Sequence, residues 1–131
     1  MVDRSKDNRP LSPHLTIYKP QFTSVLSIMH RITGIGLMLS VILVITWFVA
    51  LSIGAGAFAL IDNFFNLILI RLILLSSVWA LCYHTCTGIR HLIWDLGYGL
   101  EVKWIAPSAY VVLLASLCLF IFTLYLCWSV L

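Results

Sequence analysis

Three long apolar segments constrain this chain more than any other feature of its sequence. They cover about residues 22–53, 63–95 and 107–131, and about 20 mostly apolar residues suffice for a helix to cross a bilayer. Only 10% of the 131 residues are charged, whereas a water-soluble domain carries about a quarter. We therefore predict an all-α membrane protein, with an N-terminal segment at 1–21 and a domain of three transmembrane helices at 22–131.

Residues that favour helix ends mark the boundaries of these spans. Gly54 and Gly56 weaken a helix after the first span. Asp62 or Asn63 can cap the start of the second span, and Pro107 is favourable in the first turn of the third. We expect the second helix to begin at about residue 63 and the third at Pro107.

The distribution of basic residues predicts the orientation. Most lie at one expected end of the bundle: Arg4, Lys6, Arg9, Lys19, Arg31, Arg90 and Lys103. The positive-inside rule places this end, and the N-terminus, on the cytoplasmic or matrix side. The first segment contains Asp3 and Asp7 and lacks an apolar core, so it resembles neither a cleavable signal nor a transit peptide. We expect a multi-pass protein of a bacterial or mitochondrial inner membrane, with lipid around it and no nucleic-acid partner.

A first cluster of polar residues lies at the start of the first span. Ser27 and Arg31 share a helix face because they are four residues apart, while His30 points about 100° away from Arg31. A hydroxyl and a guanidinium on one face can bind a carbonyl or an anionic group. Alternatively, Arg31 is an interfacial anchor that extends to water.

A second cluster lies in the last third of the second span. His84 and His91 are seven residues apart and share one stripe of the helix, with Gly88 between them, where a flat ligand could approach the backbone. The imidazole of His84 can bind an iron, and Arg90 and His91 could meet carboxylates nearer the surface. Alternatively, His84 is a packed residue that is hydrogen-bonded to a neighbouring helix.

The depth of His84 adds a constraint. It lies roughly 15 Å inside the end of its helix, whereas His30 and His91 are expected near the boundary. No second histidine is then expected at the depth of His84. A haem held by two histidines would need its other ligand from another subunit.

The remaining polar residues point to structural roles. Arg71, near the opposite end, is expected to extend to water or to stabilise the fold, and His14 is expected to be structural. Four cysteines lie in apolar segments without a C-x-x-C pair, as is typical of packing residues: Cys82, Cys86, Cys118 and Cys127.

Two motifs resemble those of a known family. The runs RPLSPHL at 9–15 and SIMHRITG at 27–34 resemble the first signature of the succinate dehydrogenase cytochrome b556 subunit family. The run HTCTGIRHLIWDLG at 84–97 resembles its second. The similarity covers nearly the whole chain, including the three spans and their order.

The resemblance implies a membrane anchor that is part of a heterodimeric, haem-binding helical bundle in complex II. A second membrane anchor subunit would share one haem b, and a flavoprotein subunit and an iron–sulfur subunit would dock on the inner face. Electrons from succinate would then reach ubiquinone. The resemblance implies that His84 is an axial ligand of the haem iron. It places His30, Arg31 and His91 beside the haem propionates, and Ser27 and Arg31 in the quinone site.

The chain has no flavin or iron–sulfur motif, so we expect no catalytic residue in it and no succinate oxidation by this chain alone. One alternative is a fumarate reductase-type anchor, although a version with two haems would need four histidines buried at paired depths. The other is a small haem-free membrane adaptor or transporter. Such a protein would show no haem absorbance and would tolerate replacement of His84.

Overall fold

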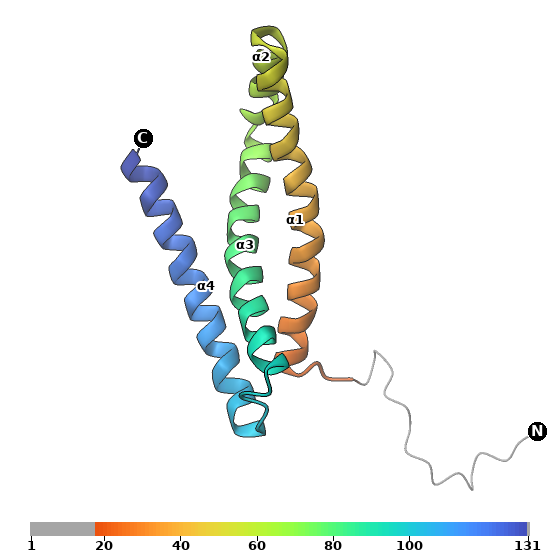
Figure 1. The fold of residues 1–131 in the computed structure, drawn as a ribbon, viewed down its shortest axis with the longest axis vertical. Coiled ribbons are helices and arrows are strands. Elements are labelled where there is room, and N and C mark those ends of the chain that lie inside the picture. Colours follow the sequence, from red (N-terminus) through yellow and green to blue (C-terminus); the bar gives the residue numbers. More distant parts are fainter. Residues whose placement is uncertain (1–17, 131) are drawn as a thin grey trace, which may run out of the picture.

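The computed structural model describes residues 18–130, which form helices and short connections without any strand. The helices are α1 (Phe22–Ile53), α2 (Ala55–Phe65), α3 (Ile68–Asp95) and α4 (Val102–Val130). Helices α1 and α3 run side by side, α2 lies at their far end, and α4 leans away from α3 (Figure 1). The predicted all-α fold is confirmed. Expectations for residues 1–17, including His14, lie outside the described residues.

Three of the helices are long and apolar enough to cross a membrane: Phe22–Ile53, Ile68–Asp95 and Val102–Ser129. Much of their apolar surface is exposed in the isolated chain; Met38, for example, is 70% exposed. Such a surface suits lipid or other membrane subunits, since neither requires polar side chains. The prediction of three membrane-spanning helices is confirmed.

Two expected helix boundaries are wrong. The second long helix begins at Ile68 because the preceding apolar residues form α2, so Asp62 and Asn63 lie within α2 and do not cap α3. Gly54, with φ of 130°, allows the chain to turn from α1 into α2, since glycine lacks the Cβ that disfavours this region. The third long helix begins at Val102 and contains Pro107.

One end of the bundle gathers most of the described basic residues. Helices α1 and α4 begin there and α3 ends there (Figure 1). We call it the basic end, since Lys19, Arg31, Arg90 and Lys103 lie at or near it, whereas Arg71 lies toward the other end. The described basic residues are therefore concentrated at one end of the bundle, as the predicted orientation requires.

Buried residues and polar contacts join α1 to α3, and all three long helices meet near the basic end. Leu26, Tyr83 and Ala109 form a small buried cluster between α1, α3 and α4. The Tyr83 hydroxyl donates a hydrogen bond of 2.9 Å to the Leu26 carbonyl. Further along, the hydroxyls of Ser40 and Ser77 lie 2.6 Å apart. These polar contacts join α1 to α3, as is common between membrane helices.

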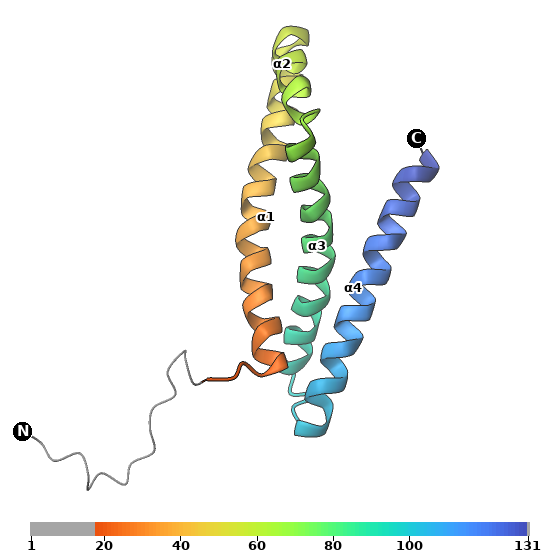
Figure 2. The same ribbon diagram turned by 180° about the vertical axis from the view of Figure 1, so that it is seen from behind.

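Helix α4 is packed over only part of its length. Its buried residues are Ala109, Val112 and Ser116, which lie in its first half. Beyond them the helix diverges from α3, which both views show (Figures 1 and 2). The contact between α3 and α4 is therefore concentrated toward the basic end.

Arg71 stabilises the break between α2 and α3. Its guanidinium donates a hydrogen bond to the side-chain oxygen of Asn66. The amide nitrogen of Asn66 donates in turn to the backbone carbonyl of Asp62 at 3.0 Å and to its carboxylate at 3.2 Å. These contacts support the structural interpretation of Arg71.

Candidate functional site

Two imidazole rings stack between α1 and α3. The ring centroids of His30 and His84 are 3.9 Å apart, with an angle of 12° between the rings. Nδ1 of His84 lies 3.1 Å from the carbonyl oxygen of His30. Since a carbonyl only accepts hydrogen bonds, this contact requires a proton on Nδ1, and in the neutral tautomer with that proton the lone pair is on Nε2. A metal-binding histidine is commonly oriented by such a bond from its other nitrogen.

The ring of His84 fits against α1 because residue 34 is glycine. A Cβ atom at Gly34 would lie only 3.1 Å from Cε1 of His84. Beside the ring is an opening of about 410 Å³, lined by Gly34, Leu37, Met38, Val41, Ile42 and His84. One imidazole therefore borders a largely apolar surface of α1.

The expectation that no other histidine lies at the level of His84 is wrong. His30 is about 12 Å inside the start of α1, and His84 is about 16 Å inside the end of α3. The difference is less than one helical turn, and the side chains bridge it. The two rings nevertheless leave no space for an iron between them. Metal–imidazole bonds are about 2 Å long, so axial nitrogens lie about 4 Å apart and the ring centroids still further.

His30 also contacts α3 through a hydroxyl. Its Nδ1 lies 2.5 Å from Oγ1 of Thr87, and that hydroxyl donates to the backbone carbonyl of Tyr83 at 2.8 Å. The ring of His91 is 5.2 Å from that of His30. The structure thus brings His30, His84 and His91 together. It adds Thr87, whose only signal in the sequence is its place between the two histidines of α3.

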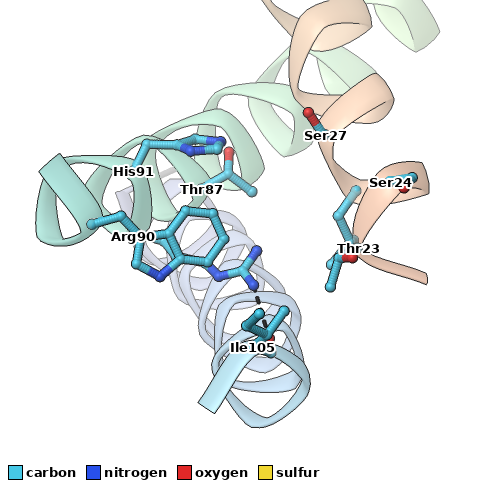
Figure 3. A pocket seen from close by; sticks show the side chains of 9 residues that line it. Thr23, Ser24, Ser27, Thr87, Arg90, His91 and Ile105 are labelled. Carbon is cyan, nitrogen blue, oxygen red and sulfur yellow. Dashed lines mark hydrogen bonds between the residues drawn. The ribbon is translucent and has the colours of Figure 1, made fainter. Parts of the chain in front are cut away.

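A second cavity of about 320 Å³ lies near the basic end, between α1, α3 and α4. We call it the hydroxyl-lined pocket; its lining residues are Thr23, Ser24, Leu26, Ser27, Thr87, Arg90, His91, Trp94 and Ile105. Figure 3 shows Thr23, Ser24 and Ser27 on α1, across from Thr87, Arg90 and His91 on α3. Hydroxyls, an imidazole and a guanidinium can together bind the oxygen atoms of a polar head group.

The structure separates the two residues predicted to bind a quinone. Ser27 lines the hydroxyl-lined pocket, but Arg31 does not. The Arg31 side chain is exposed, and among residues 18–130 it makes no hydrogen bond. Arg31 lies one helical turn further along α1 than Ser27, beyond the residues of α1 that line the pocket. Its position agrees with the alternative interpretation of Arg31 as an interfacial anchor.

Arg90 occupies the pocket wall instead, where the sequence analysis assigned no quinone-binding residue. Its Nε donates to the hydroxyl of Ser108 at 3.0 Å. Its Nη2 donates to the carbonyl of Ile105 at 2.8 Å, a bond that Figure 3 shows as a dashed line. The guanidinium carbon lies 4.0 Å from the centroid of the Trp94 ring. Both hydrogen-bond partners belong to α4, so Arg90 joins α4 to α3 at the edge of the pocket.

The four cysteines are free thiols. Cys82 is buried, Cys86 is half-buried, and Cys118 and Cys127 are exposed on α4. Among residues 18–130, no group of three or more His, Cys, Asp or Glu side chains is placed to hold a metal ion. The histidine stack and the hydroxyl-lined pocket are therefore the two candidate sites.

Comparisons with known proteins agree on one family. A family model for the succinate dehydrogenase/fumarate reductase transmembrane subunit matches residues 5–123. The chain is 42% identical to the succinate dehydrogenase cytochrome b556 subunit of Paracoccus denitrificans, over 95% of each chain. It is 40% identical to that of Rickettsia prowazekii, over 86% of this chain and 88% of the relative. It is also 42% identical to the cytochrome b560 subunit of Marchantia polymorpha, over 85% of each.

Proposed function

This chain belongs to the succinate dehydrogenase/fumarate reductase transmembrane subunit family, and we propose that it is the cytochrome b anchor of a succinate:ubiquinone oxidoreductase. Its relatives are named as cytochrome subunits of succinate dehydrogenase, and its three apolar helices suit an anchor. In this proposal the chain binds haem b together with a second membrane anchor and forms part of the site where ubiquinone is reduced.

The observation that carries the haem assignment is the environment of His84. Its Nδ1 is held by the His30 carbonyl, which leaves Nε2 able to bind an iron. The apolar opening beside Gly34 suits a flat macrocycle. When bound, haem b supplies a one-electron redox centre. Because the stacked His30 cannot be the opposite ligand, we assign that ligand to the second anchor subunit.

We propose that His30, Arg31 and His91 bind the haem propionates. His91 lies two helical turns nearer the basic end than His84, and its ring is close to that of His30. Arg31 is exposed near the same end. Carboxylates near the polar boundary would find a guanidinium and imidazole N–H groups at this level, and charge-assisted hydrogen bonds are the stronger ones.

The hydroxyl-lined pocket is our candidate for the quinone head group. Its volume of about 320 Å³ lies at the lower end of the range for small-molecule sites, about 300–1,000 Å³. The Ser27 hydroxyl can donate to a quinone carbonyl oxygen, and such a bond strengthens as that oxygen becomes negative during reduction. We retain Arg31 as a further candidate, although its side chain does not line this pocket.

We further propose that the flavoprotein and iron–sulfur subunits dock at the basic end, which would then face the cytoplasm or matrix from an inner membrane. The described basic residues near that end support this orientation. The hydroxyl-lined pocket opens near the same end, so a quinone there would lie close to the docked subunits. Short distances favour electron delivery to the quinone.

The test is a dithionite-reduced minus oxidised spectrum of the purified complex, with His84→Leu beside the unmodified chain. We expect a b-type α-band that His84→Leu abolishes or shifts, while Thr123→Val, a half-buried position in the second half of α4, leaves it intact. No α-band in an intact complex that oxidises succinate would refute haem binding. An unchanged band in His84→Leu would remove His84 as a ligand.

The quinone assignment needs a separate readout. Ser27→Ala should lower the rate of quinone reduction while succinate oxidation by an artificial dye is preserved, because the dye accepts electrons before the membrane site. Equal loss of both activities would indicate a damaged complex rather than a quinone contact. Unchanged quinone reduction would count against the hydroxyl-lined pocket.

A further inference from the structure

Arg90 is the one buried charged side chain among residues 18–130, with 7% of its surface exposed. A buried arginine in a membrane-spanning helix is costly and is usually paired with an opposite charge. Arg90 has no such partner: within residues 18–130 the described ion pair is that of Lys103 with Glu101. Its described neighbours are a hydroxyl, a backbone carbonyl and an aromatic ring, so its positive charge is solvated but not neutralised.

The guanidinium also has hydrogen-bonding capacity left over. It carries five N–H donors, of which the structure assigns one on Nε to Ser108 and one on Nη2 to Ile105. The others have no partner among residues 18–130. Arg90 lines the hydroxyl-lined pocket, and Figure 3 places it where α3 meets α4, across from Ser27 on α1. A fixed cation with spare donors therefore borders this cavity.

We infer that Arg90 is a substrate-binding residue of the hydroxyl-lined pocket, donating hydrogen bonds to an oxygen of the quinone head group. This inference rests on the proposed quinone site. Reduction of a quinone to a quinol takes up two electrons, supplied by succinate oxidation in the complex, and two protons, supplied by water. Arg90 keeps its own protons throughout. Its role is to stabilise the negative charge that builds on the oxygen before the oxygen is protonated.

The contacts from α4 suit Arg90 to this role better than Arg31. Ser108 and Ile105 hold the guanidinium in one orientation, and Trp94 covers one of its faces. A donor that is already oriented does not need to reorganise when charge develops. The exposed side chain of Arg31 has no such support among the described residues.

The experiment compares Arg90→Gln with Arg71→Gln in the purified complex, using a short-chain ubiquinone analogue as the acceptor. Arg71 is a matched control, because it is an arginine of the same helix near the opposite end. Arg90→Gln should lower kcat/KM for the quinone about ten- to hundredfold, the range expected for a lost charge-assisted hydrogen bond. Dye-linked succinate oxidation and the haem spectrum should be unchanged. Arg71→Gln should leave all three readouts unchanged.

A native kcat/KM in Arg90→Gln would overturn the inference. If that variant fails to assemble, Arg90→Lys decides, since an ammonium group keeps the charge but cannot reproduce the planar fork of donors. We then expect a several-fold loss of kcat/KM with dye-linked activity intact, and native quinone kinetics would overturn the inference. Ser27→Ala separates the two proposals. If it impairs quinone reduction and the Arg90 variants do not, only this inference fails; if neither does, the quinone site itself is misplaced.

Discussion

Gly34→Ala should disturb the histidine stack without removing any functional group. A Cβ at this position would lie 3.1 Å from Cε1 of His84, closer than ordinary van der Waals contact. The ring cannot simply turn away. Its Nδ1 is bonded to the His30 carbonyl at 3.1 Å, and its face packs on the His30 ring at 3.9 Å. The added methyl group must therefore displace the imidazole by a few tenths of an ångström.

The magnitude follows from two opposing terms. Overpacking a well-packed site costs about 1–3 kcal/mol, whereas replacing glycine by alanine within a helix gains about 1 kcal/mol. Gly34→Ala should therefore lower the free energy of unfolding by about 0–2 kcal/mol. At Gly36, in the same helix, an added Cβ would lie within 4 Å of no heavy atom of residues 18–130 apart from the adjoining residues and the helix backbone. Gly36→Ala should therefore raise the free energy of unfolding by about 1 kcal/mol.

The assays are thermal inactivation of the complex and redox titration of the haem that we propose His84 to bind. A weaker Nδ1–H···O bond makes the imidazole of His84 less basic. A less basic ligand stabilises oxidised iron less, so the midpoint potential should rise in Gly34→Ala and stay constant in Gly36→Ala. The reasoning would be refuted by a Gly34→Ala complex with an unchanged potential and the same gain in stability as Gly36→Ala.

Two further predictions concern the contacts between α1 and α3. Tyr83→Phe removes the hydrogen bond to the Leu26 carbonyl and should destabilise the complex by about 0.6–1.7 kcal/mol in thermal inactivation, whereas Tyr125→Phe, at an exposed position, should be neutral. Equal effects of Tyr83→Phe and Tyr125→Phe on thermal inactivation would contradict the hydrogen bond from Tyr83 to Leu26. Ser40→Ala and Ser77→Ala should show a coupling energy of similar size in a double-mutant cycle; simple additivity would show that the two hydroxyls do not interact.

The number of membrane-spanning helices could be predicted from the sequence, because a bilayer demands a minimum length of apolar helix. The start of α3 could not. Residues 55–65 are on average as apolar as a span, and the polar residues Asp62, Asn63 and Asn66 do not by themselves show at which of them the helix breaks. Pro107 also gave a wrong prediction for the start of α4. The helix begins five residues before it, at Val102, so Pro107 lies in the second turn, where its missing N–H removes one backbone hydrogen bond without ending the helix.

In the candidate site, the sequence predicts which residues of one helix share a face, but it does not predict which residues of two different helices are in contact. The joint stripe of His84 and His91 follows from helical geometry alone. The stacking of His30 on His84 depends on how far α1 slides along α3, and neither helix encodes that offset by itself. The position of Arg90 depends likewise on Ser108 and Ile105, which belong to a different helix.

The length of α1 has a consequence for how the chain sits in membranes of different thickness. Its 32 residues extend about 48 Å, whereas the hydrocarbon layer is about 30 Å thick. Trp94, Trp104 and Lys103 lie toward the basic end, and such residues anchor a helix at the head groups. The excess length must then project on the opposite side, where α2 lies (Figure 1). A thinner or thicker bilayer would expose or immerse α2, while the imidazole stack stays at a constant depth below the anchored surface.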